Sequence, residues 1–327
     1  MDEEAEDKDP VNWRPWVSWA VVAPVVIWAI ARTFGLERGF PTVQLMAYTP
    51  YVLLLSLVIL LAVVLLRQWL AFAVGILAFI ALSIAVVPRE LGGPDEVSGG
   101  RPVNVMTFNL ARGRADLGEL RSLVESRNVD ILALQEVTPE AADGLKEIRI
   151  GQLLGNSVVA TEEGHQGRFT GGAIFSRYPL EGLGQPATYS RQPDVLVSIP
   201  GAIPFRLRSV HPMAPAGPRT TTQWADEFDD FPSAAEAGSP WVLAGDFNAT
   251  LDHQKLRDVI GTGFRDAADV MGLGIVSTWP SSFKWPLPVT LDHVLADDSI
   301  AITGYDVEAI SKSDHRAVFA DLVIPDR

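Results

Sequence analysis

Apolar residues are concentrated in roughly the first ninety positions of the chain. Residues 45–66 and 69–87 contain no charged side chain, and their apolar character continues around the whole helical circumference. A helix on the surface of a soluble domain has a polar face instead. Each stretch has about 20 residues, which at about 1.5 Å per residue span the hydrocarbon core of a bilayer, about 30 Å thick. We therefore predict transmembrane helices over about 45–66 and 69–88.

A shorter apolar stretch precedes these two and is interrupted by Pro24. Transmembrane helices tolerate proline where neighbouring groups satisfy the carbonyl that it leaves unpaired. Trp13, Trp16 and Trp19 are placed to form an aromatic belt at the membrane interface. We predict a first transmembrane helix over about 16–33. The alternative is a helix that lies in the interface.

Residues 16–88 are thus expected to form a membrane region of three helices, preceded by an acidic tail at residues 1–15. An acidic leader followed by several spans is not typical of a cleaved signal peptide, whose leader is basic. Three basic residues flank the spans on each side, so the positive-inside rule does not decide the orientation. An odd number of spans places the two ends of the chain on opposite sides. We expect a multi-pass protein of the cell membrane whose larger domain is extracytoplasmic.

Beyond the membrane region, glycine, proline and charge without periodicity predict a linker at 89–101, followed by a domain at 102–327. In this domain short apolar runs alternate with amphipathic or irregular stretches, which is typical of a two-sheet sandwich of the α/β or α+β class. Strands are predicted at 103–108, 130–134, 173–176, 195–199, 205–210, 241–244, 290–295 and 317–323, and helices at 116–127, 139–148, 219–231 and 253–260.

Polar side chains able to bind metal or phosphate stand at the ends of six predicted strands. Functional residues collect where loops leave a rigid sheet. Taken singly, each of these residues has an ordinary alternative, such as an Asx turn, a helix cap or a loop histidine. Among the other histidines, His293 is expected to alternate outward, and His165 and His253 are not assigned to a site. The strand-end residues are Asn109, Glu136, His211, Asp246, Asn248, Asp292, Asp314 and His315.

The composition narrows the chemistry. The 327 residues include no cysteine, which excludes disulfides, thiolate metal sites and cysteine nucleophiles. There are 26 Lys and Arg against 40 Asp and Glu, a formal net charge of −14. This acidic balance argues against broad binding of a nucleic-acid backbone, although local basic patches can oppose the net sign.

Seven short sequence blocks, and their order along the chain, resemble the endonuclease/exonuclease/phosphatase superfamily. This superfamily includes DNase I-like nucleases, neutral sphingomyelinases and inositol-polyphosphate phosphatases. The resemblance covers nearly all of residues 103–323 and implies a four-layered α/β sandwich, with two packed mixed sheets flanked by helices. GDFN together with a terminal SDHR is its most specific feature. The blocks are VMTFN at 105–109, LQEV at 134–137, FSRYPL at 175–180, His211, GDFN at 245–248, LDHV at 291–294 and SDHRA at 313–317.

The resemblance implies a divalent metal ion, usually Mg²⁺ with Mn²⁺ as an alternative. Glu136 matches the family's metal-binding glutamate, and Asn109 and Asp314 match positions that complete or approach that site. Hard oxygen ligands with an open, water-rich shell suit magnesium. Whether a second ion is used stays open.

The resemblance also assigns the catalytic residues. Asp246 matches the residue that orients or deprotonates the attacking water, and Asn248 matches a phosphate ligand. His315 matches the histidine on the scissile phosphate, with Asp292 as its partner. His211 matches the second histidine, which stabilises the pentacoordinate state or assists the leaving group. The implied reaction is in-line attack of water on phosphorus.

The predicted tether favours a substrate in the membrane. A short linker, at most about 3.5 Å per residue, keeps the domain near the bilayer. The whole arrangement resembles the actinobacterial membrane phosphohydrolases linked to teicoplanin resistance, which implies a lipid-linked phosphate or pyrophosphate, such as undecaprenyl pyrophosphate, at the outer face. Trp279, Phe283 and Trp285 are candidates to line a lipid-facing entrance, or alternatively pack within their loop.

Three other functions remain open on the sequence. A membrane-tethered extracellular nuclease and a sphingomyelinase-like phospholipid phosphodiesterase use the same chemistry, because the family determines the reaction more firmly than the substrate. A catalytically silent binding module is disfavoured, since competent residues occupy all the matched positions. Nucleic acid is therefore an unfavoured but open partner, and a lipid phosphate is the expected one.

Overall fold

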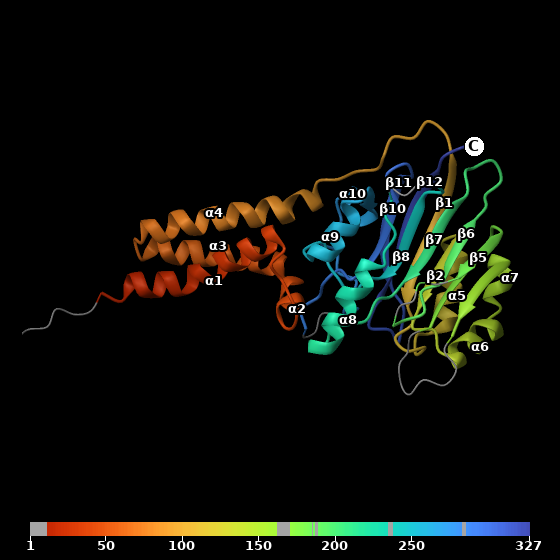
Figure 1. Cartoon of the computed structure of the whole chain (residues 1–327), viewed down its shortest axis with the longest axis horizontal. Helices are drawn as coiled ribbons and strands as arrows, with labels where there is room; N and C mark the ends of the chain where they lie inside the picture. Colours follow the sequence, from red (N-terminus) through yellow and green to blue (C-terminus); the bar gives the residue numbers. More distant parts are fainter. Residues whose placement is uncertain (1–11, 162–170, 185, 187–188, 235–237, 283–285) are drawn as a thin grey trace, which may run out of the picture. The chain divides into compact units, whose positions relative to one another are not determined.

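The computed structural model describes residues 12–161, 171–184, 186, 189–234, 238–282 and 286–327 (Figure 1). The chain forms two compact units. The helical unit contains Thr49–Ala85 and the described part of Met1–Leu36. The other, which we call the sheet unit, contains Glu37–Tyr48 and Val86–Arg327. Of the expected acidic tail, residues 1–11 lie outside the described part of the chain.

The helical unit is built from α1 (Arg14–Phe34), α3 (Thr49–Leu65) and α4 (Trp69–Val86). By length and composition two segments can cross a membrane, α1 and Trp69–Glu90, whereas α3 is apolar but shorter. The helix predicted from residue 45 begins instead at Thr49. Pro50 accounts for this start, because proline is favoured in the first helical turn, where its missing N–H costs no hydrogen bond.

The sheet unit contains two six-stranded mixed sheets. In each sheet one central pair of strands is parallel, β1 with β2 and β7 with β8, and the remaining pairs are antiparallel. The first sheet has the order β11 (Ala301–Ala309), β12 (Arg316–Ile324), β1 (Arg101–Asn109), β2 (Ile131–Gln135), β4 (Gly172–Ser176) and β3 (Asn156–Ala160). The second has the order β5 (Leu180–Gly184), β6 (Asp194–Val197), β7 (Phe205–Val210), β8 (Trp241–Asp246), β10 (Asp292–Asp297) and β9 (Phe264–Asp266).

The sheets pack face to face, and helices cover their outer faces (Figure 1). Valine, isoleucine and leucine side chains from the inner faces form the central core. The expected four-layered α/β sandwich is confirmed. Helices α5 (Leu117–Ser126), α6 (Pro139–Glu147) and α7 (Ile150–Leu154) pack on the first sheet, and α8 (Pro218–Asp229) and α9 (Gln254–Ile260) pack on the second. The short elements α2 (Thr42–Met46), η1 (Val87–Glu90) and α10 (Ala267–Val270) complete the unit.

All eight predicted strands and four predicted helices are present, with ends shifted by a few residues. Strands β3, β5, β9 and β11 were not predicted, and all four lie at sheet edges. Four of the five residues of β5 are exposed, so the strand lacks the alternation of buried and exposed positions that identifies a half-buried strand.

Central strands of both sheets bring their polar termini to one edge of the sandwich. Asn109 ends β1, and its neighbour β2 ends at Gln135, beside Glu136. In the second sheet Asp246, at the end of β8, pairs in register with Asp292, at the start of β10. The buried Gln135 side chain joins the sheets here, because its Nε2 donates to Thr107 Oγ1 and to Ser209 Oγ, each at 3.0 Å. The strand ends are therefore held together across the interface of the two sheets.

The expected linker at 89–101 is bonded to the sheet unit. Arg89 is buried, and its guanidinium donates to both carboxylate oxygens of Asp252, at 2.9 and 2.7 Å. Asp95 forms a similar two-point ion pair with Arg265. These long-range pairs leave no local pattern in the sequence, which explains why the segment resembles a free linker.

Replacing Arg89 by alanine is expected to lower the free energy of unfolding by about 3–5 kcal/mol, because it leaves the Asp252 carboxylate buried without its partner. The matched control is Arg101→Ala, whose ion pair with Asp326 is about half exposed and is expected to contribute at most about 1 kcal/mol. Urea unfolding of the full chain in detergent measures both. Equal losses for the two variants would contradict a stabilising role for the Arg89 pair.

Candidate active site

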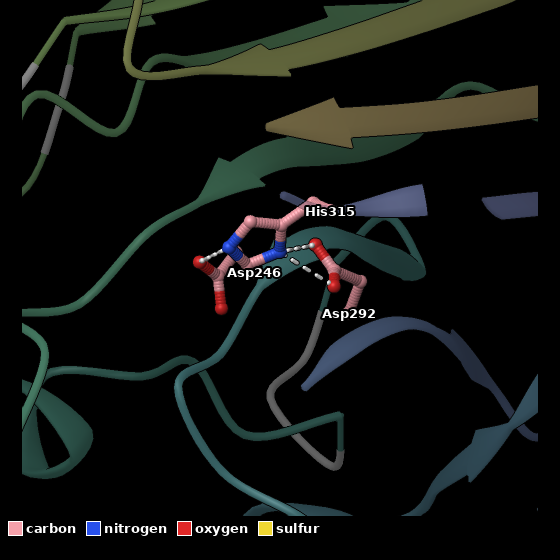
Figure 2. A group of neighbouring side chains, drawn as sticks. All are labelled: Asp246, Asp292 and His315. Carbon is pink, nitrogen blue, oxygen red and sulfur yellow. Dashed lines mark hydrogen bonds and ion pairs between the residues drawn. The ribbon is translucent and has the colours of Figure 1, made fainter. Parts of the chain in front are cut away.

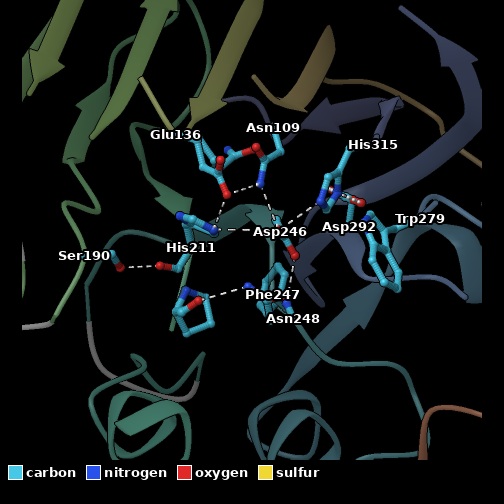
Figure 3. Close-up of polar contacts among 12 residues, drawn as sticks. Asn109, Glu136, Ser190, His211, Asp246, Phe247, Asn248, Trp279, Asp292 and His315 are labelled. Carbon is cyan, nitrogen blue, oxygen red and sulfur yellow. Dashed lines mark hydrogen bonds and ion pairs between the residues drawn. The ribbon is translucent and has the colours of Figure 1, made fainter. Parts of the chain in front are cut away.

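The eight strand-end residues converge on one pocket with a volume of about 390 Å³. All of them except Asp314 are labelled in Figure 3. Six of them line the pocket, and the side chains of the other two, Asn109 and Asp292, contact lining residues through hydrogen bonds. The six that line the pocket are Glu136, His211, Asp246, Asn248, Asp314 and His315.

Glu136 is fixed by the loop that follows β1. One of its carboxylate oxygens accepts the backbone N–H of Arg112 at 2.5 Å, and the other lies 3.4 Å from Asn109 Nδ2. The same Nδ2 donates to Asp246 Oδ2 at 3.0 Å, while Asn109 Oδ1 accepts the N–H of Ala111 at 2.9 Å. Asn109 therefore bridges two carboxylates through its nitrogen, and its oxygen is engaged away from them. Through these bonds Asn109 positions Glu136 and Asp246, and its role at the metal site stays a prediction.

Three residues that line the pocket have left-handed backbone conformations although none is glycine: Arg112 with φ 62°, Glu136 with φ 54° and Asn248 with φ 49°. Such conformations cost free energy and persist where surrounding contacts enforce them, commonly at functional sites. For Asn248 the contacts are a backbone N–H bond to Asp246 Oδ1 at 2.9 Å and a side-chain bond to the carbonyl of Pro212 at 3.0 Å. Phe247, which lies between Asp246 and Asn248 along the chain, is fully buried and anchors the turn in the core.

His315 lies between two carboxylates (Figure 2). Its Nδ1 is 2.9 Å from Asp292 Oδ2, and its Nε2 is 3.6 Å from Asp246 Oδ2. Burial alone would lower the pKa of His315, but the charges of Asp292 and Asp246 outweigh it and raise the pKa to about 10. Asp292 is oriented in turn by Thr278, whose hydroxyl accepts the Asp292 backbone N–H at 3.0 Å. The imidazole is thus held in its charged form at the pocket wall.

Asp246 is the carboxylate on which these groups converge. It is 1% exposed, and burial raises its pKa against the opposing effect of the His315 charge. A raised pKa makes a carboxylate a stronger base.

His211 faces the same carboxylates from the second sheet. Its Nε2 lies 3.7 Å from both Glu136 Oε1 and Asp246 Oδ2. Among the described residues its Nδ1 has no hydrogen-bond partner. The backbone on either side is fixed, since the His211 N–H donates to Gln192 and its carbonyl accepts the hydroxyl of Ser190. The imidazole is therefore anchored through the main chain, with Nε2 directed to the site.

Asp314 and Trp279 form the opposite side of the pocket. Trp279 Nε1 donates to Asp314 Oδ2 at 3.2 Å, and the indole lies 6.4 Å from the His315 ring. Trp279 lines the pocket, and a lipid-facing entrance at this residue stays a prediction. Phe283 and Trp285 lie outside the described residues.

Two groups of side chains in the described part of the chain are candidates to hold a cation. The ligand atoms of Asp246, Asp292 and His315 lie within 4.8 Å of one another. A histidine that is protonated and directed at carboxylates through both nitrogens offers no lone pair to a metal, which argues against this group. Glu136 and Asp314 instead present carboxylates to an open pocket. This donor set fits Mg²⁺, which binds one or two carboxylates and keeps waters or substrate oxygens as its other ligands.

The other two described histidines are structural. His293, expected to alternate outward, is buried, with Nδ1 2.7 Å from Asp266 and Nε2 3.0 Å from the Ala249 carbonyl. The expectation was wrong because β10 lies between two other strands and is buried along its whole length. His253 is also buried, with Nε2 2.8 Å from the Val43 carbonyl.

Sequence reasoning missed the pocket residues that come from outside the motifs. Gln44, Ala47 and Tyr48 line the pocket from α2 and the residues that follow it. Ala47 and Tyr48 lie in the stretch 45–66, whose apolar composition predicted a membrane helix, and Gln44 immediately precedes it, so no local signal marked these residues as part of a pocket. Arg112 was also missed, although it lies three residues beyond the matched VMTFN block.

Comparison with known proteins identifies the same region. The model of the Endonuclease/Exonuclease/phosphatase family matches residues 106–315. None of the curated protein sequences gives a significant match.

Solved structures resemble this chain over about two thirds of its length. An endonuclease/exonuclease/phosphatase from Beutenbergia cavernae is 17% identical, with a TM-score of 0.53, over 69% of this chain and 72% of that one. The mannosyl-6-phosphatase Bt3783 of Bacteroides thetaiotaomicron is 19% identical, with a TM-score of 0.46, over 68% and 100%. D. rerio TDP2 complexed with a single-strand DNA product is 14% identical, with a TM-score of 0.49, over 68% and 98%. At 17% identity the first of these likenesses shows the fold alone.

Proposed function

The chain belongs to the endonuclease/exonuclease/phosphatase family, whose members hydrolyse phosphoesters, and on that premise we propose that it cleaves a phosphate or pyrophosphate bond of a membrane lipid. One observation carries the assignment of the site. The charged His315, fixed by Asp292, faces Asp246 at the pocket wall, with Glu136 held beside them by Asn109. This arrangement supplies a base, a cation and a metal-binding carboxylate within one pocket.

In an in-line displacement at phosphorus, each of these side chains has a separate role. Asp246 orients a water molecule and accepts its proton, a role that suits a buried carboxylate with a raised pKa. His315 donates from Nε2 to a phosphate oxygen, and Asn248 binds the phosphate from the neighbouring wall. His211 places Nε2 where charge develops on the phosphate or the leaving group.

Members of this family use a divalent metal ion, and we infer Mg²⁺ or Mn²⁺ held by Glu136 and Asp314. When bound, the ion supplies positive charge to the phosphate oxygens and lowers the cost of the negative charge that develops there. Three carboxylates line this pocket, those of Glu136, Asp246 and Asp314, and Arg112 is the only guanidinium among its described lining residues, so a divalent cation would balance negative charge here.

Two features support a lipid substrate. Two helices are long and apolar enough to anchor the protein in a membrane, which keeps the site near a bilayer. The net charge of −14 does not favour a long polyanionic backbone such as a nucleic acid. A multi-pass anchor, an outer-face location and a link to teicoplanin resistance complete the proposal. Hydrolysis of a lipid phosphate by intact cells, stopped by the impermeant chelator EDTA, checks the location, and insensitivity to EDTA would place the site inside.

The substrate is tested with purified full-length protein in detergent and Mg²⁺. Polyprenyl diphosphate, sphingomyelin and single- and double-stranded DNA are offered in parallel, with EDTA as the control. Release of phosphate from the polyprenyl diphosphate alone is the expected result. Cleavage of DNA with inert lipids, at rates that fall steeply with added salt, would replace the proposal by a tethered nuclease. Release of phosphocholine would replace it by a phospholipid phosphodiesterase.

A further inference from the structure

The segment Glu37–Tyr48 joins two apolar helices along the chain, yet it folds as part of the sheet unit. Val43 and Met46 of α2 are 3% and 4% exposed. Val43 belongs to the same hydrophobic cluster as Trp224 and Phe247, the residue between Asp246 and Asn248. The segment is therefore packed into the layer that supports the catalytic turn.

Hydrogen bonds hold the segment to the two loops that carry catalytic residues. His253 Nδ1 accepts the backbone N–H of Thr250 at 2.8 Å, and burial lowers the pKa of His253, so the neutral ring carries its proton on Nε2. That Nε2 donates to the Val43 carbonyl at 2.8 Å. Gln44 Nε2 donates to the carbonyl of Pro215 and to Thr221 Oγ1.

These bonds set the segment at the pocket itself. The loop of His253 continues from Asp246 and Asn248, and the loop of Pro215 continues from His211. Gln44, Ala47 and Tyr48 form part of the pocket lining. The pocket thus combines residues of the sandwich with a wall formed by a segment that lies between two apolar helices in the sequence.

The pocket has an apolar part as well as a polar one. Besides the acidic and histidine side chains, its lining includes Ala47, Ala214, Pro215, Ala216, Val289 and Leu291. The segment Glu37–Tyr48 also exposes apolar side chains outside the pocket, with Phe40 49% and Leu45 46% exposed. Exposed apolar groups are stable beside lipid, where they lose contact with water. A substrate with a charged head and an apolar chain matches both parts.

We propose that the wall formed by Gln44, Ala47 and Tyr48 is a specificity element that contacts the first apolar part of the substrate next to its phosphate. The proposal rests on the proposed lipid-phosphate hydrolase activity and deepens it. Tyr48 is followed directly by Thr49, the first residue of α3, so the chain continues from the pocket wall into an apolar helix within one peptide bond. The wall therefore selects an amphiphilic phosphate over a soluble one.

The test compares a polyprenyl diphosphate with methyl diphosphate, which has the same diphosphate head group but lacks the apolar chain, on the full-length protein in detergent. Ala47→Trp fills the wall side of the pocket, and Tyr48→Ala removes an aromatic side chain from it. Each is expected to lower kcat/KM for the polyprenyl diphosphate about tenfold or more, chiefly through KM, and to lower it less for methyl diphosphate. The matched control is Leu45→Trp, which adds an indole to the same segment, Glu37–Tyr48, but outside the pocket lining, and should keep the wild-type preference.

The readout is the ratio of the two kcat/KM values, which a general loss of folded protein does not change. A reduced ratio in both pocket variants, with the wild-type ratio in Leu45→Trp, supports the wall as a specificity element. An unchanged ratio in Ala47→Trp and Tyr48→Ala would overturn it while leaving the hydrolase activity in place. If the wild-type protein cleaves neither diphosphate, the proposed function and the specificity element both fail. If Ala47→Trp does not fold, Tyr48→Ala decides the outcome by the same ratio.

Discussion

Replacing His315 by alanine is expected to lower kcat for phosphoester hydrolysis by at least about 10³-fold. The substitution removes the only group seen between Asp292 and Asp246 in the described structure, and with it the hydrogen bond from Nε2 to the phosphate. A positioned acid or base contributes about 10²–10⁴-fold, and one preorganised charged donor contributes a further effect of similar size. Steady-state kinetics at saturating substrate measure the change.

A companion substitution, Asp292→Asn, separates orientation from charge. The amide keeps the shape of the carboxylate but removes the negative charge that favours the imidazolium. We expect a loss between that of His315→Ala and wild type, with KM changed less than kcat. The thermal midpoint of each variant provides the folding control. If His315→Ala retains more than about a tenth of wild-type kcat while folded, the histidine is not part of the reaction.

Replacing Glu136 by glutamine is expected to abolish both activity and the response of the protein to Mg²⁺. Glutamine is nearly isosteric but neutral, and hard divalent cations prefer charged carboxylates. Binding to the native state alone stabilises a protein by about 2.7 kcal/mol at a ligand concentration 100 times Kd. Thermal unfolding with increasing Mg²⁺ should therefore show a rising midpoint for the wild type and a flat one for Glu136→Gln.

The matched control is Glu140→Gln, the same substitution four residues further on, at an exposed position in the first turn of α6. It should keep the wild-type activity and Mg²⁺ response. If Glu136→Gln also keeps the Mg²⁺ response, the ion is bound elsewhere. A response that Asp292→Asn then removes would assign it to the group of Asp246, Asp292 and His315 instead.

Much of the site could be predicted from the sequence because its residues stand at the ends of central strands. Asn109 and Glu136 follow parallel neighbours, whose carboxyl ends meet at one edge of a sheet. The positions of Asp246 and Asp292 at strand ends could also be predicted from the sequence, because each residue adjoins a strongly apolar run. A fully buried strand appears in the sequence as a continuous apolar run, and the polar residue that follows the run marks the end of the strand.

The role of a residue within the site was harder to predict than its presence. Asn109 matched a metal position, but the orientation of its amide depends on the Ala111 N–H and on two carboxylates from other strands. His293 follows Asp292 in the motif and was expected to face outward, whereas Asp266 and the Ala249 carbonyl hold it in the interior. Such orientations depend on partners that are distant along the chain.

The sequence by itself determined the division into an apolar helical region and a phosphoesterase-like domain, the order of the central strands along the chain, and the residues that meet at their ends. Helical and strand periodicity, strand termini and motif spacing are local properties, and local chain geometry suffices to interpret them. Only the tertiary structure decided that Glu37–Tyr48 and Arg89 belong to the sheet unit and that Gln44, Ala47 and Tyr48 line the pocket. These contacts join residues more than 160 positions apart, such as Gln44 with Thr221, and burial against distant partners leaves no periodic trace in either segment.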